Sequence, residues 1–179
     1  MNGQALPSTV LGLPDVAADK LYQVTIDISD LKVSDDPNAV LITYALGSCI
    51  AVIVYDAVKH VGGMIHYMLP LSNTAPDKAQ TKPAMFADTG VPLLFLKLYE
   101  YGCRKQDLVV KIAGGGKLYE DHGVFDIGKR NYTVLRKIFW KNDIIIAAED
   151  VGGAKSRTAK LYVGNGLVTI RAQGQETPL

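Results

Sequence analysis

The most constraining feature of this sequence is an unbroken run of six aliphatic or aromatic residues at positions 50–55. A strand with apolar side chains on both faces belongs in the middle of a sheet. Segments 39–43 and 63–69 flank the run and are also rich in apolar residues, so we predict three strands with 50–55 as the central one. The run is far shorter than the about 20 residues that a membrane-spanning helix needs, and we expect no membrane insertion.

The rest of the chain predicts two helices among further strands. Apolar residues recur at helical spacing in the first helix, which we expect to start at Asp88 or Thr89 as N-cap and to stop at Gly102. Its buried stripe is predicted to comprise Val91, Leu94, Phe95 and Leu98. A second helix is predicted over about residues 129–141, and residues 72–83 are predicted to be a surface loop.

Further strands are predicted at residues 22–28, 108–113 and 144–148. Residues 161–170 predict a hairpin, because Asn165-Gly166 is typical of a two-residue turn. Together these segments indicate one α+β domain over residues 21–179, without internal repeats. Residues 1–20 mix Gly, Pro, Ser and Asp without a period, and we predict a leader that is mobile or orders on contact.

Composition and charge narrow the class of protein. The chain has 179 residues, and 19 Lys and Arg against 18 Asp and Glu give a net charge of +1. A chain with so little net charge has no strong positive potential to attract the phosphates of a nucleic acid, so we expect no nucleic-acid binding. Cys49 and Cys103 lie in unrelated contexts, which favours free thiols and a cytoplasmic location. With no obvious exposed apolar stripe in the sequence, we expect a monomer.

Cys49 follows a Gly47-Ser48 bend at the start of the central strand, where a thiol can be presented at the edge of a sheet. If residues 50–55 and 63–69 form an antiparallel hairpin, a register whose paired numbers sum to 115 places Cys49 opposite His66, and a sum of 117 makes the two diagonal neighbours. An even sum would separate them, and the sequence leaves this choice open. A neighbouring imidazole would take the thiol proton and leave a thiolate–imidazolium pair.

Thr43 ends the preceding predicted strand, and its hydroxyl could orient the imidazole as the third member of a triad. Each of the three residues also has a plainer interpretation. Cys49 could be a buried structural thiol, His66 a core histidine bonded to backbone, and Thr43 an ordinary strand residue. The residue types and their spacing leave both interpretations open.

Six motifs follow one another along the chain. They are Leu46-Gly-Ser-Cys49, Gly62-Gly-Met-Ile-His-Tyr-Met-Leu-Pro70, Ala87-Asp-Thr89, Lys111-Ile-Ala-Gly-Gly115, Ile127-Gly-Lys-Arg-Asn131 and Ala148-Glu-Asp-Val-Gly-Gly153. Six ordered motifs are far more specific than a single Gly-Ser-Cys. From about residue 22 to the C-terminus, the chain resembles in consistent order the CheD family of chemoreceptor glutamine deamidases in bacterial and archaeal chemotaxis.

The resemblance implies hydrolysis of glutamine side-chain amides on methyl-accepting chemoreceptors by a triad of Cys49, His66 and Thr43, without a metal or cofactor. It also implies a layered sandwich of mainly antiparallel β-sheets with about two flanking helices, similar to bacterial toxin deamidases. An alternative role implied by the same family is a binding module that regulates a CheC-type chemotaxis phosphatase. A thiol peptidase would use the same chemistry but needs an extended groove for its substrate.

Two glycine-containing turns are candidates for contacts with the substrate. The amides from Gly47 through Ser48 to Cys49 are natural oxyanion donors in a tight turn. Residues 113–117 lack the spacing of a phosphate loop. Gly114 and Gly115 are candidates for close backbone approach or substrate binding at the site, and a plain glycine-rich turn is the alternative. Arg157 is predicted to be a surface residue that either meets acidic groups of a partner or has no special role.

Overall fold

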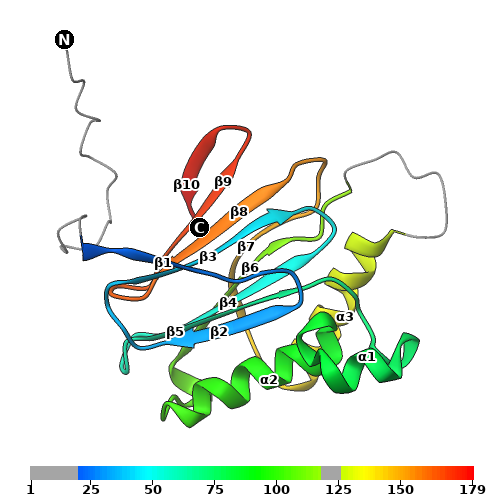
Figure 1. Ribbon diagram of the computed structural model, residues 1–179, viewed down its shortest axis with the longest axis horizontal. Helices are drawn as coiled ribbons and strands as arrows, with labels where there is room; N and C mark the ends of the chain where they lie inside the picture. The colour runs from blue at the N-terminus through cyan, green and yellow to red at the C-terminus, as the bar shows by residue number, and fades with distance from the viewer. Residues whose placement is uncertain (1–19, 118–125) are drawn as a thin grey trace.

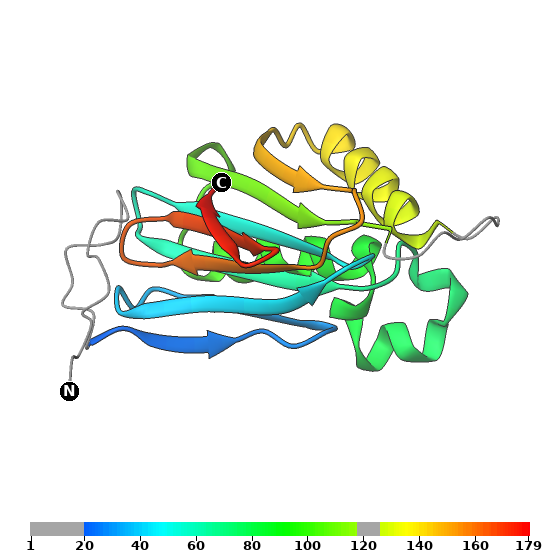
Figure 2. The same cartoon turned by 90° about the horizontal axis from the view of Figure 1, so that it is seen from above.

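The computed structural model describes residues 20–117 and 126–179, so the predicted leader at residues 1–20 lies almost entirely outside the described residues. Within these ranges, two five-stranded sheets face each other. Helices cover the outer face of one of them (Figure 1). The same layers are seen from above in Figure 2. The protein is therefore an α+β layered sandwich, as predicted.

The first sheet has, in spatial order, the strands β1 (Tyr22–Thr25), β3 (Ala39–Leu46), β8 (Arg157–Tyr162), β9 (Leu167–Ala172) and β10 (Gln175–Pro178). The second has β2 (Asp30–Ser34), β5 (Val61–Tyr67), β4 (Ile50–Asp56), β6 (Leu108–Gly114) and β7 (Ile146–Val151). Two pairings, β1 with β3 and β6 with β7, are parallel, and the other described pairings are antiparallel. The helices are α1 (Pro76–Thr81), α2 (Ala87–Glu100) and α3 (Ile127–Lys141), with short 3-10 turns η2 (Ser72–Thr74), η3 (Pro83–Met85) and η4 (Lys105–Asp107).

Strand β4 is the central strand of its sheet and all of its residues are buried, as the apolar run predicts. Its side chains alternate between two hydrophobic cores. Val52 and its even-numbered neighbours pack with α2 and α3, whereas Ile53 and its odd-numbered neighbours pack against the first sheet. The end of β4 that carries Cys49 is thus held from both sides.

The predicted stripe of α2 is confirmed, because Val91, Leu94, Phe95 and Leu98 are all buried. The N-cap differs from the prediction. Phe86 occupies that position, while the Asp88 carboxylate accepts from the Ser72 amide at 2.9 Å and the Thr89 hydroxyl donates to a carbonyl of η3. Both polar side chains therefore bind the preceding turns rather than the helix end. Gly102, with φ of 80°, follows the end of the helix as expected.

Three local predictions were wrong. Residues 72–83 contain α1 and two 3-10 turns instead of a plain loop. The hairpin of β8 and β9 pairs Tyr162 with Leu167 across a four-residue turn, because Asn165 Oδ1 accepts from the Leu167 amide at 3.0 Å and so caps the turn from within. Strands β2 and β10 were not predicted, since β10 is fully exposed and β2 is only partly buried.

Candidate active site

Thr43 and His66 meet at the interface of the two sheets. Both side chains are fully buried, and Thr43 Oγ1 lies 2.7 Å from His66 Nδ1. The Thr43 hydroxyl also donates to the Ile26 carbonyl oxygen at 2.8 Å. A hydroxyl has one hydrogen and a carbonyl only accepts, so Thr43 must accept its second bond from the His66 Nδ1–H. The neutral imidazole therefore keeps its lone pair on Nε2.

The hairpin register brings Cys49 to the same face as His66. Ala51 pairs with His66 and Ile50 with Tyr67, which is the register with a sum of 117 and makes Cys49 a diagonal neighbour of His66. Cys49 also packs against the inter-sheet core, on the side to which Ala51 points. The thiol residue is partly exposed, whereas His66 is covered. A substrate can thus reach the thiol from solvent.

This register is set by the turn between β4 and β5. Asp56 opens a four-residue turn, and its Oδ1 accepts from the amides of Val58 and Lys59, both at 2.9 Å. His60 closes the turn with a φ of 55°. These bonds fix Asp56 opposite Val61. A slip of one residue would turn His66 away from the thiol face.

The His66 Nε2 atom is buried and makes no hydrogen bond to any of the described residues. The Cys49 thiol is accordingly not bonded to it in the resting arrangement. Catalytic hydrogen bonds are often long in the absence of substrate and tighten when the substrate binds. An unpaired imidazole lone pair beside a thiol is the arrangement that a general base requires.

A glycine loop at the end of β6 fixes the backbone of the thiol residue. The Gly115 amide donates to the Cys49 carbonyl at 2.8 Å, and the Gly116 amide donates to the Gly47 carbonyl at 2.7 Å. A Cβ atom on Gly114 would lie only 2.1 Å from the Cys49 oxygen. The glycines after β6 are therefore needed for close backbone approach.

These bonds also decide which amides remain for a substrate. The Gly115 amide is occupied by Cys49, and the Gly47 amide donates to the Ala45 carbonyl at 2.9 Å. Among the described residues, no backbone carbonyl accepts from the amides of Ser48 or Cys49. Of the four predicted contact residues Gly47, Ser48, Gly114 and Gly115, Ser48 thus keeps a free amide next to the thiol.

Burial governs the protonation of the pair. It lowers the pKa of His66 to about 4, although the negative charge of Asp27 opposes this shift. It also raises the pKa of Cys49 above the ordinary 9.0 of a thiol, against the opposing effect of the residue's own amide. Burial therefore favours the neutral form of both groups, because neither charge is well solvated. The thiolate–imidazolium pair stays a prediction of the sequence.

Arg157 is not at the surface, contrary to the prediction. Its side chain is 1% exposed and lies 3.0 Å from Asp150, and it also donates to the carbonyl of Gly152 at 2.7 Å. The Gly152 amide donates in turn to the Gly114 carbonyl at 2.9 Å. Arg157 therefore supports the glycine loop from behind instead of meeting a partner.

Two groups that form hydrogen bonds in the site were given no role in the sequence analysis. The first is the Ile26 carbonyl, which no side-chain pattern could reveal. The second is Asn131 on α3, whose Nδ2 donates to the carbonyls of Ser48 at 3.0 Å and Met68 at 2.9 Å. A signal for Asn131 existed, because it ends the motif Ile127-Gly-Lys-Arg-Asn131 and lies four residues before the apolar Leu135, on the same face of the predicted helix.

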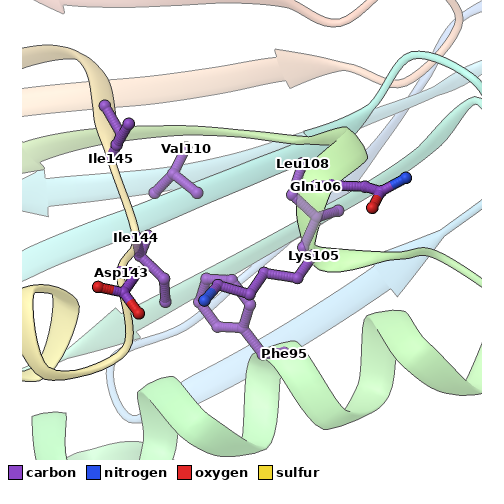
Figure 3. A pocket seen from close by; sticks show the side chains of 8 residues that line it. All are labelled: Phe95, Lys105, Gln106, Leu108, Val110, Asp143, Ile144 and Ile145. Carbon is purple, nitrogen blue, oxygen red and sulfur yellow. The ribbon is translucent and has the colours of Figure 1, made fainter.

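A cavity of about 490 Å³ lies elsewhere (Figure 3). It is lined by Phe95, Lys105, Gln106, Leu108, Val110, Asp143, Ile144 and Ile145. It opens near the start of β6, while Gly114 at the other end pairs with Ile50 beside the thiol. The length of the strand separates the two by roughly 20 Å. The cavity is therefore not part of this site.

Within residues 20–117 and 126–179, no group of three His, Cys, Asp or Glu side chains could hold a metal ion. The same described ranges contain no helix that is both long and apolar enough to cross a membrane. The chemistry that the described side chains offer is that of a thiol, an imidazole and a hydroxyl, held by backbone bonds from β6 and by α3.

Comparison with known proteins identifies the family of this chain. The pattern of the family described as CheD chemotactic sensory transduction matches residues 68–172. A protein of Anaeromyxobacter dehalogenans named probable chemoreceptor glutamine deamidase CheD 2 is 49% identical over 156 residues, which cover 87% of this chain and 98% of the relative. A CheD 1 of the same description from Syntrophus aciditrophicus is 48% identical over 151 residues, or 84% and 94% of the two chains. One from Solibacter usitatus is 44% identical over 159 residues, or 89% and 94%. This chain belongs to the CheD family.

Proposed function

We propose that this protein hydrolyses the side-chain amide of specific glutamines on the cytoplasmic regions of chemoreceptors, producing glutamate and ammonia. The observation that carries the proposal is the chain of bonds from Ile26 through Thr43 to His66, because it leaves the imidazole lone pair on Nε2 of a residue that shares its sheet face with Cys49. The names of the relatives supply the substrate.

In the first half-reaction, the Cys49 sulfur attacks the carboxamide carbon while His66 Nε2 takes the thiol proton. The C–S bond forms and the carbonyl oxygen becomes an oxyanion. His66 then gives the proton to the leaving nitrogen, the C–N bond breaks, and ammonia departs. The product is a thioester between Cys49 and the former glutamine side chain.

In the second half-reaction, His66 Nε2 removes a proton from water as the water oxygen attacks the thioester carbon. The C–S bond breaks, and the proton returns to the sulfur. The substrate leaves as glutamate, and the neutral pair is restored. Thr43 keeps the Nδ1–H bonded throughout, so that the same nitrogen faces the reaction in both steps.

The amides of Ser48 and Cys49 are the proposed oxyanion donors. They lie in the bend that presents the thiol and have no backbone acceptor among the described residues, in contrast to the occupied amides of Gly47 and Gly115. Donors fixed before the reaction stabilise a developing negative charge most effectively. Because the proposed substrates are receptor cytoplasmic regions, we propose that the enzyme acts in the cytoplasm.

Mass spectrometry of a receptor cytoplasmic fragment tests the proposal. Deamidation adds about one dalton for each glutamine converted, whereas peptidase cleavage changes the length of the fragment and binding alone changes neither. The Cys49→Ala protein is the matched control, because it retains the fold and lacks the nucleophile. A fragment whose mass is unchanged by the parent protein would refute the proposed activity.

A further inference from the structure

The inward face of α3 is apolar or small with one exception. Its buried residues are Gly128, Asn131, Leu135 and Phe139, at helical spacing. Asn131 is 0% exposed, and its Oδ1 has no hydrogen-bond partner among the described residues. A leucine at this place would remove the unpaired Oδ1, but it would also remove the two N–H bonds that the asparagine makes. Packing alone therefore does not account for an asparagine here.

The Asn131 amide joins the two segments that carry the reactive pair. Its Nδ2 donates to the carbonyl of Ser48, the residue before Cys49, and to that of Met68, two residues after His66. Both partners are carbonyls that can only accept, so the amide nitrogen must face them. One planar group thus fixes the thiol bend against the end of β5.

The position of Asn131 is itself fixed by its surroundings. The hydroxyl of Tyr67, the neighbour of His66, donates to the backbone carbonyl of Asn131 at 3.1 Å. A Cβ atom on Gly128, one turn earlier, would lie 2.6 Å from the Gly116 carbonyl oxygen, so the helix rests directly on the glycine loop. These two contacts therefore fix the position of the Asn131 side-chain amide.

We propose that Asn131 is a positioning residue for catalysis, which holds Cys49 and His66 in the relative placement that proton transfer needs. The inference rests on the proposed function for its kinetic consequence. Loss of the two bonds would release the Ser48 and Met68 carbonyls, and a misplacement of about 1 Å at a reacting group can cost on the order of 100-fold in rate.

The test compares Asn131→Ala and Asn131→Asp with Phe139→Leu, a packing change two turns further along the same buried face. Aspartate keeps the shape of asparagine but, when ionised, has no N–H to donate. In single-turnover deamidation of a receptor fragment, we expect kcat to fall on the order of 10–100-fold in the Asn131 variants with little change in KM. Phe139→Leu should lower Tm and leave kcat nearly unchanged. If Asn131→Asp does not fold, the comparison of Asn131→Ala with Phe139→Leu is enough to test the inference.

Hydrogen exchange gives a readout that needs no substrate. Peptides that report the hydrogen-bonded amides of Gly47, Gly116 and Met68 should exchange faster in Asn131→Ala than in the parent, and not in Phe139→Leu. The inference is overturned if these peptides are unchanged, or if the Asn131 variants deamidate at the parental rate. If the parent protein itself is inactive while the local exchange still rises, the receptor substrate is wrong and the positioning role stands.

Discussion

A single methyl group added at Gly114 should disable the enzyme while leaving it folded. Gly114 has a φ of 115°, and a Cβ placed on it would meet the Cys49 carbonyl oxygen at 2.1 Å. The nearest neighbours are all backbone atoms of Cys49 and Ile50, so no side chain can rotate away to relieve the contact. The backbone of the nucleophile itself must move.

The size of the effect follows from this contact. Cβ atoms do not approach other heavy atoms closer than 3.0 Å, so the Cys49 carbonyl must shift by roughly 1 Å. Such a shift would lengthen the bond from the Gly115 amide and reorient the Ser48 and Cys49 amides. A displacement of this size costs on the order of 100-fold in kcat. The positive φ adds about 1–3 kcal/mol of lost stability for any side chain.

Gly174→Ala is the matched control. Gly174 also has a positive φ, of 83°, but a Cβ there would meet nothing within 4 Å. Both variants therefore carry a similar backbone strain, and only Gly114→Ala moves the thiol. The assay is single-turnover deamidation of a receptor fragment, below the Tm of both variants. A Gly114→Ala protein within about threefold of the parental kcat, or a Gly174→Ala protein equally impaired, would refute the reasoning.

Substitutions of the three triad residues, with Cys103→Ala as a control, test the roles assigned to the triad. Cys49→Ala should abolish deamidation with the fold intact, whereas Cys103→Ala should retain activity because Cys103 is buried in the helix-side core. The reverse outcome would mean that the nucleophile is misassigned. Thr43→Ala should lower kcat on the order of 10–100-fold, while His66→Ala should be as damaging as loss of the thiol. Thr43→Ser should recover most of the rate, since serine can still donate to the Ile26 carbonyl and accept from His66. If Thr43→Ser is as impaired as Thr43→Ala, the hydroxyl has no orienting role.

The parts of the fold that could be predicted are those with a strong burial signal. The run in β4 and the stripe of α2 each repeat one side-chain preference over many residues, so tertiary contacts reinforce the local pattern. Strand β10 offers no such signal, because it consists of four exposed residues and exists through its pairing with β9. Edge strands of this kind follow from the sheet that they join.

Within the site, too, some features could be predicted from the sequence and others could not. The parity of the β4–β5 register was readable only as two alternatives, and the choice was made by Asp56, whose carboxylate caps the four-residue turn. The Thr43 contact crosses from one sheet to the other, and no local pattern reports the distance between sheets. The neutral state of Cys49 and His66 likewise depends on burial, which is a property of the assembled sandwich.

That neutral state has an energetic consequence for the mechanism. Burial lowers the pKa of His66 to about 4 and raises the pKa of Cys49, so both shifts oppose transfer of the thiol proton to the imidazole before attack. We propose that proton transfer accompanies C–S bond formation, where the oxyanion donors stabilise the developing charge.

The pH dependence of Cys49 alkylation distinguishes a neutral Cys49–His66 pair from a thiolate–imidazolium pair. With a neutral pair and a raised thiol pKa, Cys49 is mostly in the thiol form at pH 7, and its reaction with iodoacetamide should rise about tenfold per pH unit through the neutral range. The sign follows from the raised thiol pKa, because each unit of pH below it removes nine-tenths of the thiolate. Cys103, with its pKa raised to about 11 by burial, should react more slowly than Cys49 throughout. His66→Ala should leave the profile of Cys49 unchanged, since no imidazolium supports the thiolate. A rate that is level between pH 5 and 8 in the parent protein and is lost in His66→Ala would establish the ion pair and refute the concerted mechanism.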